Sequence, residues 1–267
     1  MWSPLARIIP SSLTSVEVAV RPMLTSLRGG PTSRETVVHL AAKLLFDGRV
    51  IALPTDTIYG LAALVQNPSA LKTLYQIKGR DFSKPVAICV PTIASIHRWA
   101  EVTVPNSCLE RLLPGPFTLV FERTLELNPD LNPQTSLIGI RIPDFPFIQD
   151  VTTLCGEESP VALTSANLSG EPSARSVEEF RHLWPSLGGV FDAGEPLGKT
   201  EATRSGSTVV DLSRIGRFRI IREGCAFEQT RKVLVDTGLT EDLGGPSSSD
   251  IRRVKKSPSR VTCLRNR

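Results

Sequence analysis

Cysteine is scarce in this chain of 267 residues, and its spacing excludes two common kinds of cross-linked domain. The five cysteines are Cys89, Cys108, Cys155, Cys225 and Cys263. They form no Cys-x-x-Cys pair, whereas a disulfide framework or a structural zinc site needs closer, paired spacing. We therefore expect reduced, mostly buried thiols in a reducing compartment.

Histidines, long apolar runs and several standard motifs are also lacking. The only histidines are His39, His97 and His182, each in a predicted helix, so we expect no Ser-His-Asp triad. The sequence contains no G-x-x-x-x-G-K-[ST], G-x-G-x-x-G, G-x-S-x-G or H-E-x-x-H motif. No apolar run approaches the roughly 20 residues of a membrane-spanning helix, so no transmembrane segment is predicted.

Charge is distributed unevenly along the chain. Residues 251–267 carry seven basic side chains and no acidic one, and residues 1–30 hold three arginines and one glutamate. A basic tail suits RNA, a membrane surface or an acidic partner, and it equally suits solvated disorder. The N-terminal composition is typical of a mitochondrial transit peptide or of an untargeted extension. We expect a cytoplasmic protein, and a mitochondrial one if the N-terminus is a transit peptide.

Between these ends, hydrophobic periodicity predicts alternating helices and short strands. Capping boxes at Thr32–Glu35 and Ser176–Glu179 each open a helix. Helices are predicted over residues 32–47, 69–78, 93–100, 105–113, 147–155, 176–184 and 226–235. Strands are predicted over residues 50–53, 86–90, 117–121, 138–142, 161–163, 189–191, 207–212 and 218–221. The order predicts one α/β domain (32–239) with a twisted mixed sheet, flanked by an extension (1–31) and a disordered basic tail (240–267).

Small polar residues follow two of the buried strands. Thr55, Thr57 and Tyr59 come after the strand over 50–53, and Ser165 and Asn167 come after the strand over 161–163. In open α/β sheets, ligands bind at strand ends. The hydroxyl and amide groups therefore either hold a small polar ligand or cap their own turns.

Cations gather in one loop and recur in two strands. Lys78, Arg80 and Lys84 fall within seven residues, a pattern that suits either a polyphosphate site or a solvated loop. Arg141 lies in an otherwise apolar strand, so it needs Asp144, another carboxylate or a ligand as its partner. Arg222 ends another strand. Together these cations favour a deep cavity for an anionic ligand.

Two further residues complete the candidate site. Thr118 follows the rigid turn Pro114-Gly115-Pro116, which is architecture more often than chemistry. Ser207 opens a strand, and small hydroxyl residues at that position suit either a ligand contact or an ordinary strand edge.

The motifs together resemble the YrdC family of threonylcarbamoyl-AMP synthases over residues 33–238, and its eukaryotic members most of all. They are Pro-Thr-Asp-Thr-Ile-Tyr-Gly-Leu, Lys-Gly-Arg with Lys-Pro, Pro-Gly-Pro-x-Thr, Gly-x-Arg-x-Pro-Asp, Thr-Ser-Ala-Asn-x-Ser-Gly, Ser-Thr-Val-Val-Asp and Ile-Arg-x-Gly, in this order. The resemblance implies an α/β domain with a deep basic cavity that makes threonylcarbamoyl-AMP and pyrophosphate from L-threonine, bicarbonate or CO2, and ATP with Mg2+. It also implies a downstream transferase, in the KEOPS complex or its mitochondrial counterpart, that modifies tRNA, and a weak tRNA contact is compatible with the tail.

The resemblance also implies roles for the candidate residues. Thr55, Thr57, Tyr59, Thr118, Arg141 and Ser207 would line the threonine and carbamate end. Lys78, Arg80, Lys84, Ser165, Asn167 and Arg222 would hold ATP, with Lys78 and Arg80 the main catalytic cations. Two departures matter: Ile88-Cys89-Val90 stands where some members have a histidine, and Glu223 replaces the usual proline after Arg222. An RNA-binding module without catalysis is the alternative that the basic tail leaves open.

Overall fold

The computed structural model describes residues 23–27, 31–79, 85–198 and 204–242. Its strands are β1 (Met23–Ser26), β2 (Ile51–Pro54), β3 (Tyr59–Leu64), β4 (Ala87–Cys89), β5 (Ala100–Glu101), β6 (Phe117–Arg123), β7 (Leu137–Arg141), β8 (Val161–Ser165), β9 (Gly189–Asp192), β10 (Thr208–Asp211), β11 (Arg217–Arg222) and β12 (Thr240–Glu241). Its helices are α1 (Pro31–Phe46), α2 (Pro68–Ile77), α3 (Ile93–Trp99), α4 (Asn106–Leu112), α5 (Pro146–Cys155), the 3-10 helix η3 (Val177–Ser186) and α6 (Phe227–Asp236). None of the described helices is long and apolar enough to cross a bilayer.

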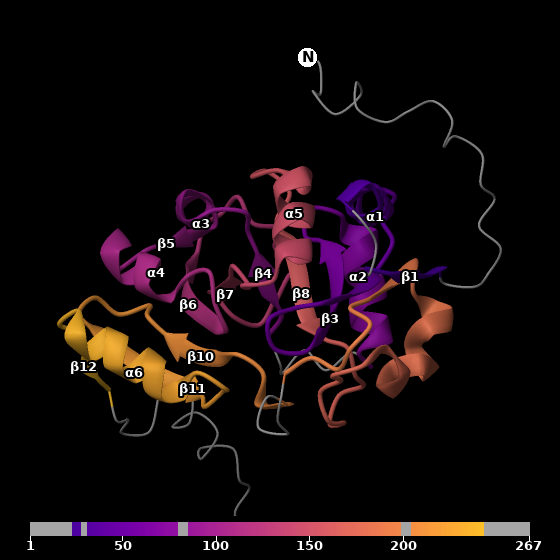
Figure 1. Cartoon of the computed structure of the whole chain (residues 1–267). Coiled ribbons are helices and arrows are strands. Elements are labelled where there is room, and N and C mark those ends of the chain that lie inside the picture. Colours follow the sequence, from indigo (N-terminus) through magenta and orange to yellow (C-terminus); the bar gives the residue numbers. More distant parts are fainter. Residues whose placement is uncertain (1–22, 28–30, 80–84, 199–203, 243–267) are drawn as a thin grey trace, which may run out of the picture.

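The strands form one mixed sheet, which confirms the predicted fold class. Their spatial order is β1-β9-β2-β3-β8-β4-β7-β6-β10-β11-β12, with β5 beside β6. β2 and β3 form an antiparallel hairpin, whereas β4 and β7 run parallel. Helices α1 and α5 pack side by side against one face of the sheet (Figure 1).

The half of the sheet from β9 to β4 is buried on both faces. Leu53 and Leu163 pack with α1 and α5, whereas Ala52 and Leu61 enter the opposite core, which α2 covers. Strands buried on both faces read as continuous apolar runs and lack the alternation that marks a half-exposed strand.

The other half of the sheet is covered by a hydrophobic core on one face only. Ile140, Leu119 and Val210 of β7, β6 and β10 enter the larger core. Among the described residues, no side chain of these strands or of β11 belongs to the core beneath α1 and α5. The second face of this half therefore carries the polar residues that alternate with the core, including Arg141 and Thr118.

Every predicted helix and strand is present, and the structure corrects five details. The strand β3 was not predicted, because its small and apolar residues directly follow the polar turn after β2. The strand β1 lies inside the segment predicted to be an extension, where it pairs in parallel with β9. The segment predicted as a helix from Ser176 is 3-10, with a non-helical residue at Phe180 and no capping bond from Ser176. Helix α1 begins one residue before its predicted cap, and β12 lies just beyond the predicted end of the domain.

The cysteines and histidines lie as expected in the part of the chain that the structure describes. Cys89, Cys108 and Cys155 are buried free thiols, and Cys225 is exposed. Cys263 lies outside the described residues. The three histidines occupy α1, α3 and η3.

Candidate active site

The turn between β2 and β3, residues 55–58, is held together by its own hydroxyl groups. Thr55 Oγ1 donates to the carbonyl oxygen of Ile58 at 2.8 Å and lies 3.1 Å from Thr57 Oγ1. It also accepts the backbone N–H groups of Thr57 and Ile58 at 3.2 and 3.3 Å. Both threonines are buried. Of the two roles that the sequence left open for Thr55, capping of the turn is therefore observed.

Tyr59 is wholly buried, and its hydroxyl group faces the end of β9. The hydroxyl donates to Asp192 Oδ1 at 3.1 Å and accepts the N–H of Ala193 at 2.9 Å. Its ring packs against Phe180, with 5.5 Å between centroids. Because four strands separate β9 from β7, the hydroxyl belongs to a different part of the sheet from Arg141. The contact that we predicted between Tyr59 and the substrate stays a prediction.

Arg141 forms a buried ion pair with Asp56, which lies in the turn between β2 and β3. Arg141 Nη2 lies 2.8 Å from Asp56 Oδ1, and the two side chains are 8% and 7% exposed. Asp56 Oδ2 accepts the backbone N–H of Asp144 at 3.0 Å. The required carboxylate is therefore Asp56, and Asp144 contributes only its backbone. Arg141 Nε is buried and makes no hydrogen bond with any described residue.

Thr118, Ser207 and Arg222 form a second contact group beside Arg141. Thr118 Oγ1 and Ser207 Oγ are 2.7 Å apart and both residues are buried. Arg222 Nη2 donates to the carbonyl oxygen of Ser207 at 2.8 Å and to Ser207 Oγ at 3.2 Å. Val209 of β10 is the register partner of both Thr118 in β6 and Arg222 in β11. The antiparallel register of β6 and β7 pairs Leu119 with Ile140, and one further step along the two strands places Thr118 opposite Arg141. Arg141, Thr118 and Arg222 thus line one face of four adjacent strands.

This face carries an excess of positive charge. Partial burial, and then the charge of Arg141, lower the pKa of the Arg222 guanidinium, although the side chain as a whole remains exposed. Asp56 is the carboxylate that pairs with Arg141, whereas Arg222 donates hydrogen bonds to Ser207. Burial raises the pKa of the adjacent Cys225 thiol, and it raises the pKa of Cys89 to about 12, so neither supplies a thiolate near neutral pH. The arrangement favours an added anion rather than covalent catalysis.

Lys78 joins the end of α2 to the end of β8. Its Nζ donates to the carbonyl oxygens of Ser165 at 2.8 Å and Asn167 at 2.5 Å, and it lies 3.4 Å from the side-chain oxygen of each. Gly79 follows with φ +79°, a left-handed conformation that glycine adopts freely and that lets the chain turn. The structure therefore brings together Lys78, Ser165 and Asn167, as the predicted triphosphate site requires.

Asn167 also organises its own turn. Its Nδ2 donates to the carbonyl oxygens of Leu168 at 2.8 Å and Glu171 at 2.7 Å. This is the turn-forming role that the sequence left open beside ligand binding. Arg80 and Lys84, the other predicted phosphate ligands, lie outside the described residues.

The turn over residues 55–58 lies between the two groups of candidate residues. At one end Asp56 binds Arg141, and a side chain added at Gly206 would meet Arg222 Nη2 and Ile58 Cδ1, each at 3.5 Å. At the other end, the N–H of Ala166 donates to the carbonyl oxygen of Tyr59 at 2.9 Å, next to Ser165 and Lys78. Both groups therefore border one short segment of chain.

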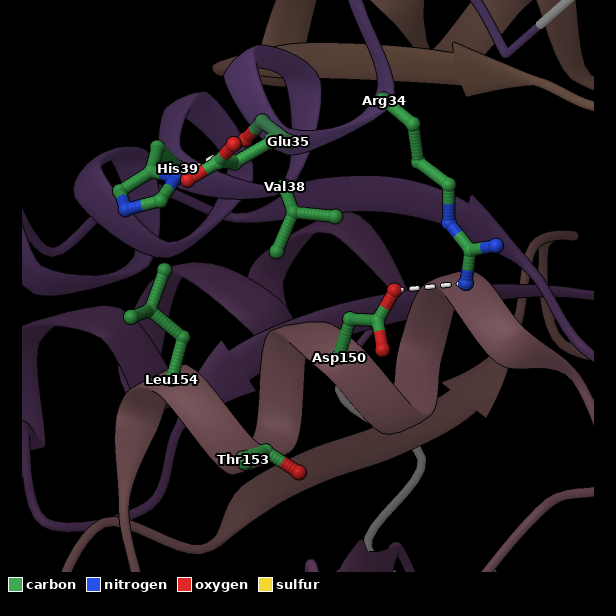
Figure 2. A pocket seen from close by; sticks show the side chains of 7 residues that line it. All are labelled: Arg34, Glu35, Val38, His39, Asp150, Thr153 and Leu154. Carbon is green, nitrogen blue, oxygen red and sulfur yellow. Dashed lines mark hydrogen bonds and ion pairs between the residues drawn. The ribbon is translucent and has the colours of Figure 1, made fainter. Parts of the chain in front are cut away.

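A hollow of about 630 Å³ lies elsewhere, between α1 and α5 (Figure 2). Its lining residues are Arg34, Glu35, Val38, His39, Asp150, Thr153 and Leu154. Arg34 Nη2 pairs with Asp150 Oδ2 at 2.6 Å, and both residues line the hollow. None of the candidate site residues lines this hollow, so it does not define the site. The deep basic cavity stays a prediction.

The fold and the site define an α/β protein with a cation-lined face suited to a small anionic ligand. Residues 43–224 match the family model Sua5_yciO_yrdC, described as "Telomere recombination". The match spans more than half of the chain, and the chain belongs to this family. This match confirms the resemblance to the YrdC family that the sequence motifs predict.

Several curated relatives bear the name threonylcarbamoyl-AMP synthase. The protein of Bos taurus is 49% identical over 221 residues, which cover 81% of this chain and 77% of the relative. That of Homo sapiens is 52% identical over 188 residues, which cover 70% of this chain and 67% of the relative.

Solved structures share the fold. Sua5 of Pyrococcus abyssi, crystallised with L-threonine, matches with a TM-score of 0.68 at 25% identity. The match covers 82% of this chain but only 62% of Sua5. YciO of E. coli matches with a TM-score of 0.63 at 22% identity, over 76% of this chain and 95% of YciO, which supports the fold alone.

Proposed function

We propose that this chain is a threonylcarbamoyl-AMP synthase. It joins L-threonine, bicarbonate or CO2, and ATP, and it releases threonylcarbamoyl-AMP and pyrophosphate. The observation that carries the proposal is the placement of two cation groups, Arg141 with Arg222 and Lys78 with Ser165, at the two ends of one turn. The names of the relatives supply the reaction.

Arg141 is the residue that we assign to the carboxylate of threonine. Its guanidinium is buried and paired with Asp56, its Nε has no partner among the described residues, and the positive charge of Arg222 lies on the same face. A second carboxylate would satisfy that nitrogen and balance the charge, in the bidentate geometry that arginine favours. The hydrogen-bonded pair of Thr118 and Ser207 offers hydroxyl groups on the same face. Thr55 and Thr57 border this end through the turn. Tyr59 lies at the other end of the turn, next to Ser165.

Lys78 is assigned to the phosphates of ATP, with Arg80 and Lys84 of the same loop. In the free protein its ammonium group is held by the carbonyl oxygens of Ser165 and Asn167. This contact positions the charge before the nucleotide arrives, so little reorganisation is needed.

Mg2+ is expected to enter with ATP, bound mainly by phosphate oxygens and water. No cluster of three or more metal-binding side chains exists among the described residues. Ser165 Oγ and Asn167 Oδ1 are the side-chain oxygens beside Lys78 that would hold it. The ion would neutralise negative charge on the phosphates.

The chemistry needs positioning rather than a covalent nucleophile. The neutral threonine amine bonds to the carbon of CO2 and releases a proton to water, or it bonds to the carbon of bicarbonate with loss of water; either route gives a carbamate. A carbamate oxygen then bonds to the α-phosphorus, the bond to the bridging oxygen breaks, and pyrophosphate leaves with the electron pair. Alignment of the two reactants can lower such a barrier by about 7–11 kcal/mol. Lys78 and Arg80 stabilise the charge that moves to pyrophosphate.

The proposal is tested by incubating the protein with labelled bicarbonate, L-threonine and ATP. A labelled adenylate and pyrophosphate should form in equal amounts, and neither should form when threonine is omitted. Pyrophosphate release without threonine, or no labelled adenylate with a protein that binds both substrates, would exclude this reaction.

The adenylate is a reactive intermediate, so a transferase must consume it. We extend the proposal to a tRNA-modifying transferase, in the KEOPS complex or its mitochondrial counterpart, as that partner. We extend the same proposal to location: the protein lies in the cytoplasm, and also in mitochondria if residues 1–30 direct import. Expression of the tagged chain with and without those residues tests this.

A further inference from the structure

Asn132 holds an unusual backbone conformation at a buried position. It is 4% exposed and is the one described residue other than glycine with positive φ, at +51°. Asparagine tolerates this left-handed region better than most residues. Asn132 lies in the excursion between β6 and β7. A buried polar residue in such a conformation needs a structural reason.

The side chain of Asn132 pairs with the backbone of Val86 as a strand would. Its Oδ1 accepts the N–H of Val86 at 2.8 Å, and its Nδ2 donates to the carbonyl oxygen of Val86 at 2.8 Å. Val86 is buried and directly precedes β4. The amide therefore fixes the point where the chain re-enters the sheet.

The same residue also fixes the end of α2. The backbone N–H of Asn132 donates to the Tyr75 hydroxyl at 2.9 Å, and that hydroxyl donates to Asn132 Oδ1 at 3.3 Å. Tyr75 is three residues before Lys78 and is buried. Asn132 thus contacts both sides of the segment over residues 79–85, which contains Arg80 and Lys84 and begins next to Lys78.

The excursion that carries Asn132 is itself firmly held. Arg123 donates to the carbonyl oxygens of Leu127, Asn128 and Leu131 at 2.6 to 2.7 Å. Asn128 Nδ2 donates to the carbonyl oxygen of Val65 at 2.9 Å, at the end of β3. Leu127 and Leu131 are buried in the larger core. Hydrogen bonds and core packing therefore hold the backbone around Asn132 in place.

We infer that Asn132 is a positioning residue for ATP binding, which sets the placement of Lys78 from outside the site. Through Tyr75 it holds the end of α2 that carries Lys78, and through Val86 it holds the point where the chain enters β4. The inference rests on the proposed function, because only that function assigns Lys78 to ATP. A polar network that fixes a site from outside commonly matters for affinity as much as direct contacts do.

Asn132→Gly tests the inference without straining the backbone, because glycine accepts a φ of +51° and loses both bonds to Val86. The steady-state KM for ATP should rise about tenfold or more, since a displacement near 1 Å can change rates about 100-fold. The KM for L-threonine should stay within about twofold. Calorimetric titration with a non-hydrolysable ATP analogue should show the same loss, independently of catalysis.

Asn128→Ala is the matched control, because it removes asparagine contacts from the same excursion without touching Tyr75 or Val86. It should lower the thermal midpoint and leave the KM for ATP unchanged. A folded Asn132→Gly protein with wild-type ATP affinity, or one that loses ATP and threonine binding equally, would overturn the inference. If Asn132→Gly does not fold, Tyr75→Phe decides: weaker ATP-analogue binding with threonine binding retained supports positioning, and unchanged ATP binding refutes it.

The two proposals fail in different ways. If wild-type protein makes no adenylate but binds the ATP analogue, and Asn132→Gly weakens that binding, the proposed reaction is wrong and the positioning role stands. If adenylate forms normally and Asn132→Gly behaves as wild type, the positioning role alone is wrong.

Discussion

Breaking the ion pair between Arg141 and Asp56 should destabilise the protein strongly. The side chains are 8% and 7% exposed, so Arg141→Met leaves the Asp56 carboxylate buried with only the N–H of Asp144 beside it. Removing one partner of a buried pair typically costs about 3–5 kcal/mol, because the remaining charge is unpaired. Asp56→Asn should lower the free energy of unfolding by a similar amount, because it leaves the Arg141 guanidinium buried without its carboxylate. The double variant should be more stable than the sum of the two losses implies, because it leaves no unpaired charge.

Urea unfolding followed by tryptophan fluorescence measures these losses. With a slope of about 2–3 kcal/mol per molar urea, Arg141→Met should move the midpoint by about 1–2 M. Arg34 and Asp150 supply the matched control, since they form an arginine–aspartate pair at 2.6 Å with side chains 46% and 47% exposed. Arg34→Met should cost about 0–1 kcal/mol, the usual value of an exposed pair.

The comparison between the buried pair of Arg141 with Asp56 and the exposed pair of Arg34 with Asp150 tests whether burial sets the loss of stability. If Arg141→Met costs no more free energy than Arg34→Met, burial does not govern the pair and the reasoning is wrong. A second measurement separates stability from function. L-Threonine should raise the unfolding midpoint of the wild type and of Arg34→Met, and it should not raise that of Arg141→Met, because the ligand carboxylate has lost its partner.

Three further outcomes are expected. Lys78→Ala should lower adenylate formation about 100-fold, as loss of one oriented donor does, and turnover near wild type would refute the role of Lys78. Removal of residues 251–267 should leave adenylate synthesis intact, whereas the RNA-binding alternative predicts a loss of salt-sensitive RNA affinity. The only two tyrosines, Tyr59 and Tyr75, are buried, and burial raises the pKa of both. Tyrosine in the unfolded chain ionises near pH 10, so above that pH the native state binds more protons than the unfolded state. The free energy of unfolding therefore falls as the pH rises through the folded pKa values. Tyrosinate absorbance should therefore increase together with loss of the tryptophan signal, and tyrosinate formation near pH 10 in folded protein would contradict this.

Local patterns predicted the helices and most of the sheet, whether one face of a strand is covered or both. Residues 117–121 and 138–142 were recognised as strands from short apolar runs. The strand β3 was not recognised, because its residues are small or apolar and directly follow a polar turn. The strand β1 is supported by pairing with β9, which follows it by more than 160 residues, and no local pattern carries that information.

The candidate site shows the same limit. The sequence located Lys78, Ser165 and Asn167, and the structure brings them into contact. It could not choose a partner for Arg141, because Asp56 lies 85 positions away. Asn132 was missed altogether, since an asparagine before proline in a loop is ordinary and its partners lie 57 and 46 positions away. Its only distinguishing feature, a positive φ, is visible in coordinates alone.

Under the proposed function, the incomplete pairing of Arg141 links stability to binding. A buried guanidinium whose Nε has no hydrogen-bond partner among the described residues lowers the stability of the free protein, because that nitrogen has lost water without gaining an acceptor. A ligand carboxylate that supplies the acceptor recovers this loss, and the recovered free energy appears as affinity. An apolar replacement for both partners would remove the loss and the affinity together, which explains why a less stable arrangement is useful at this position.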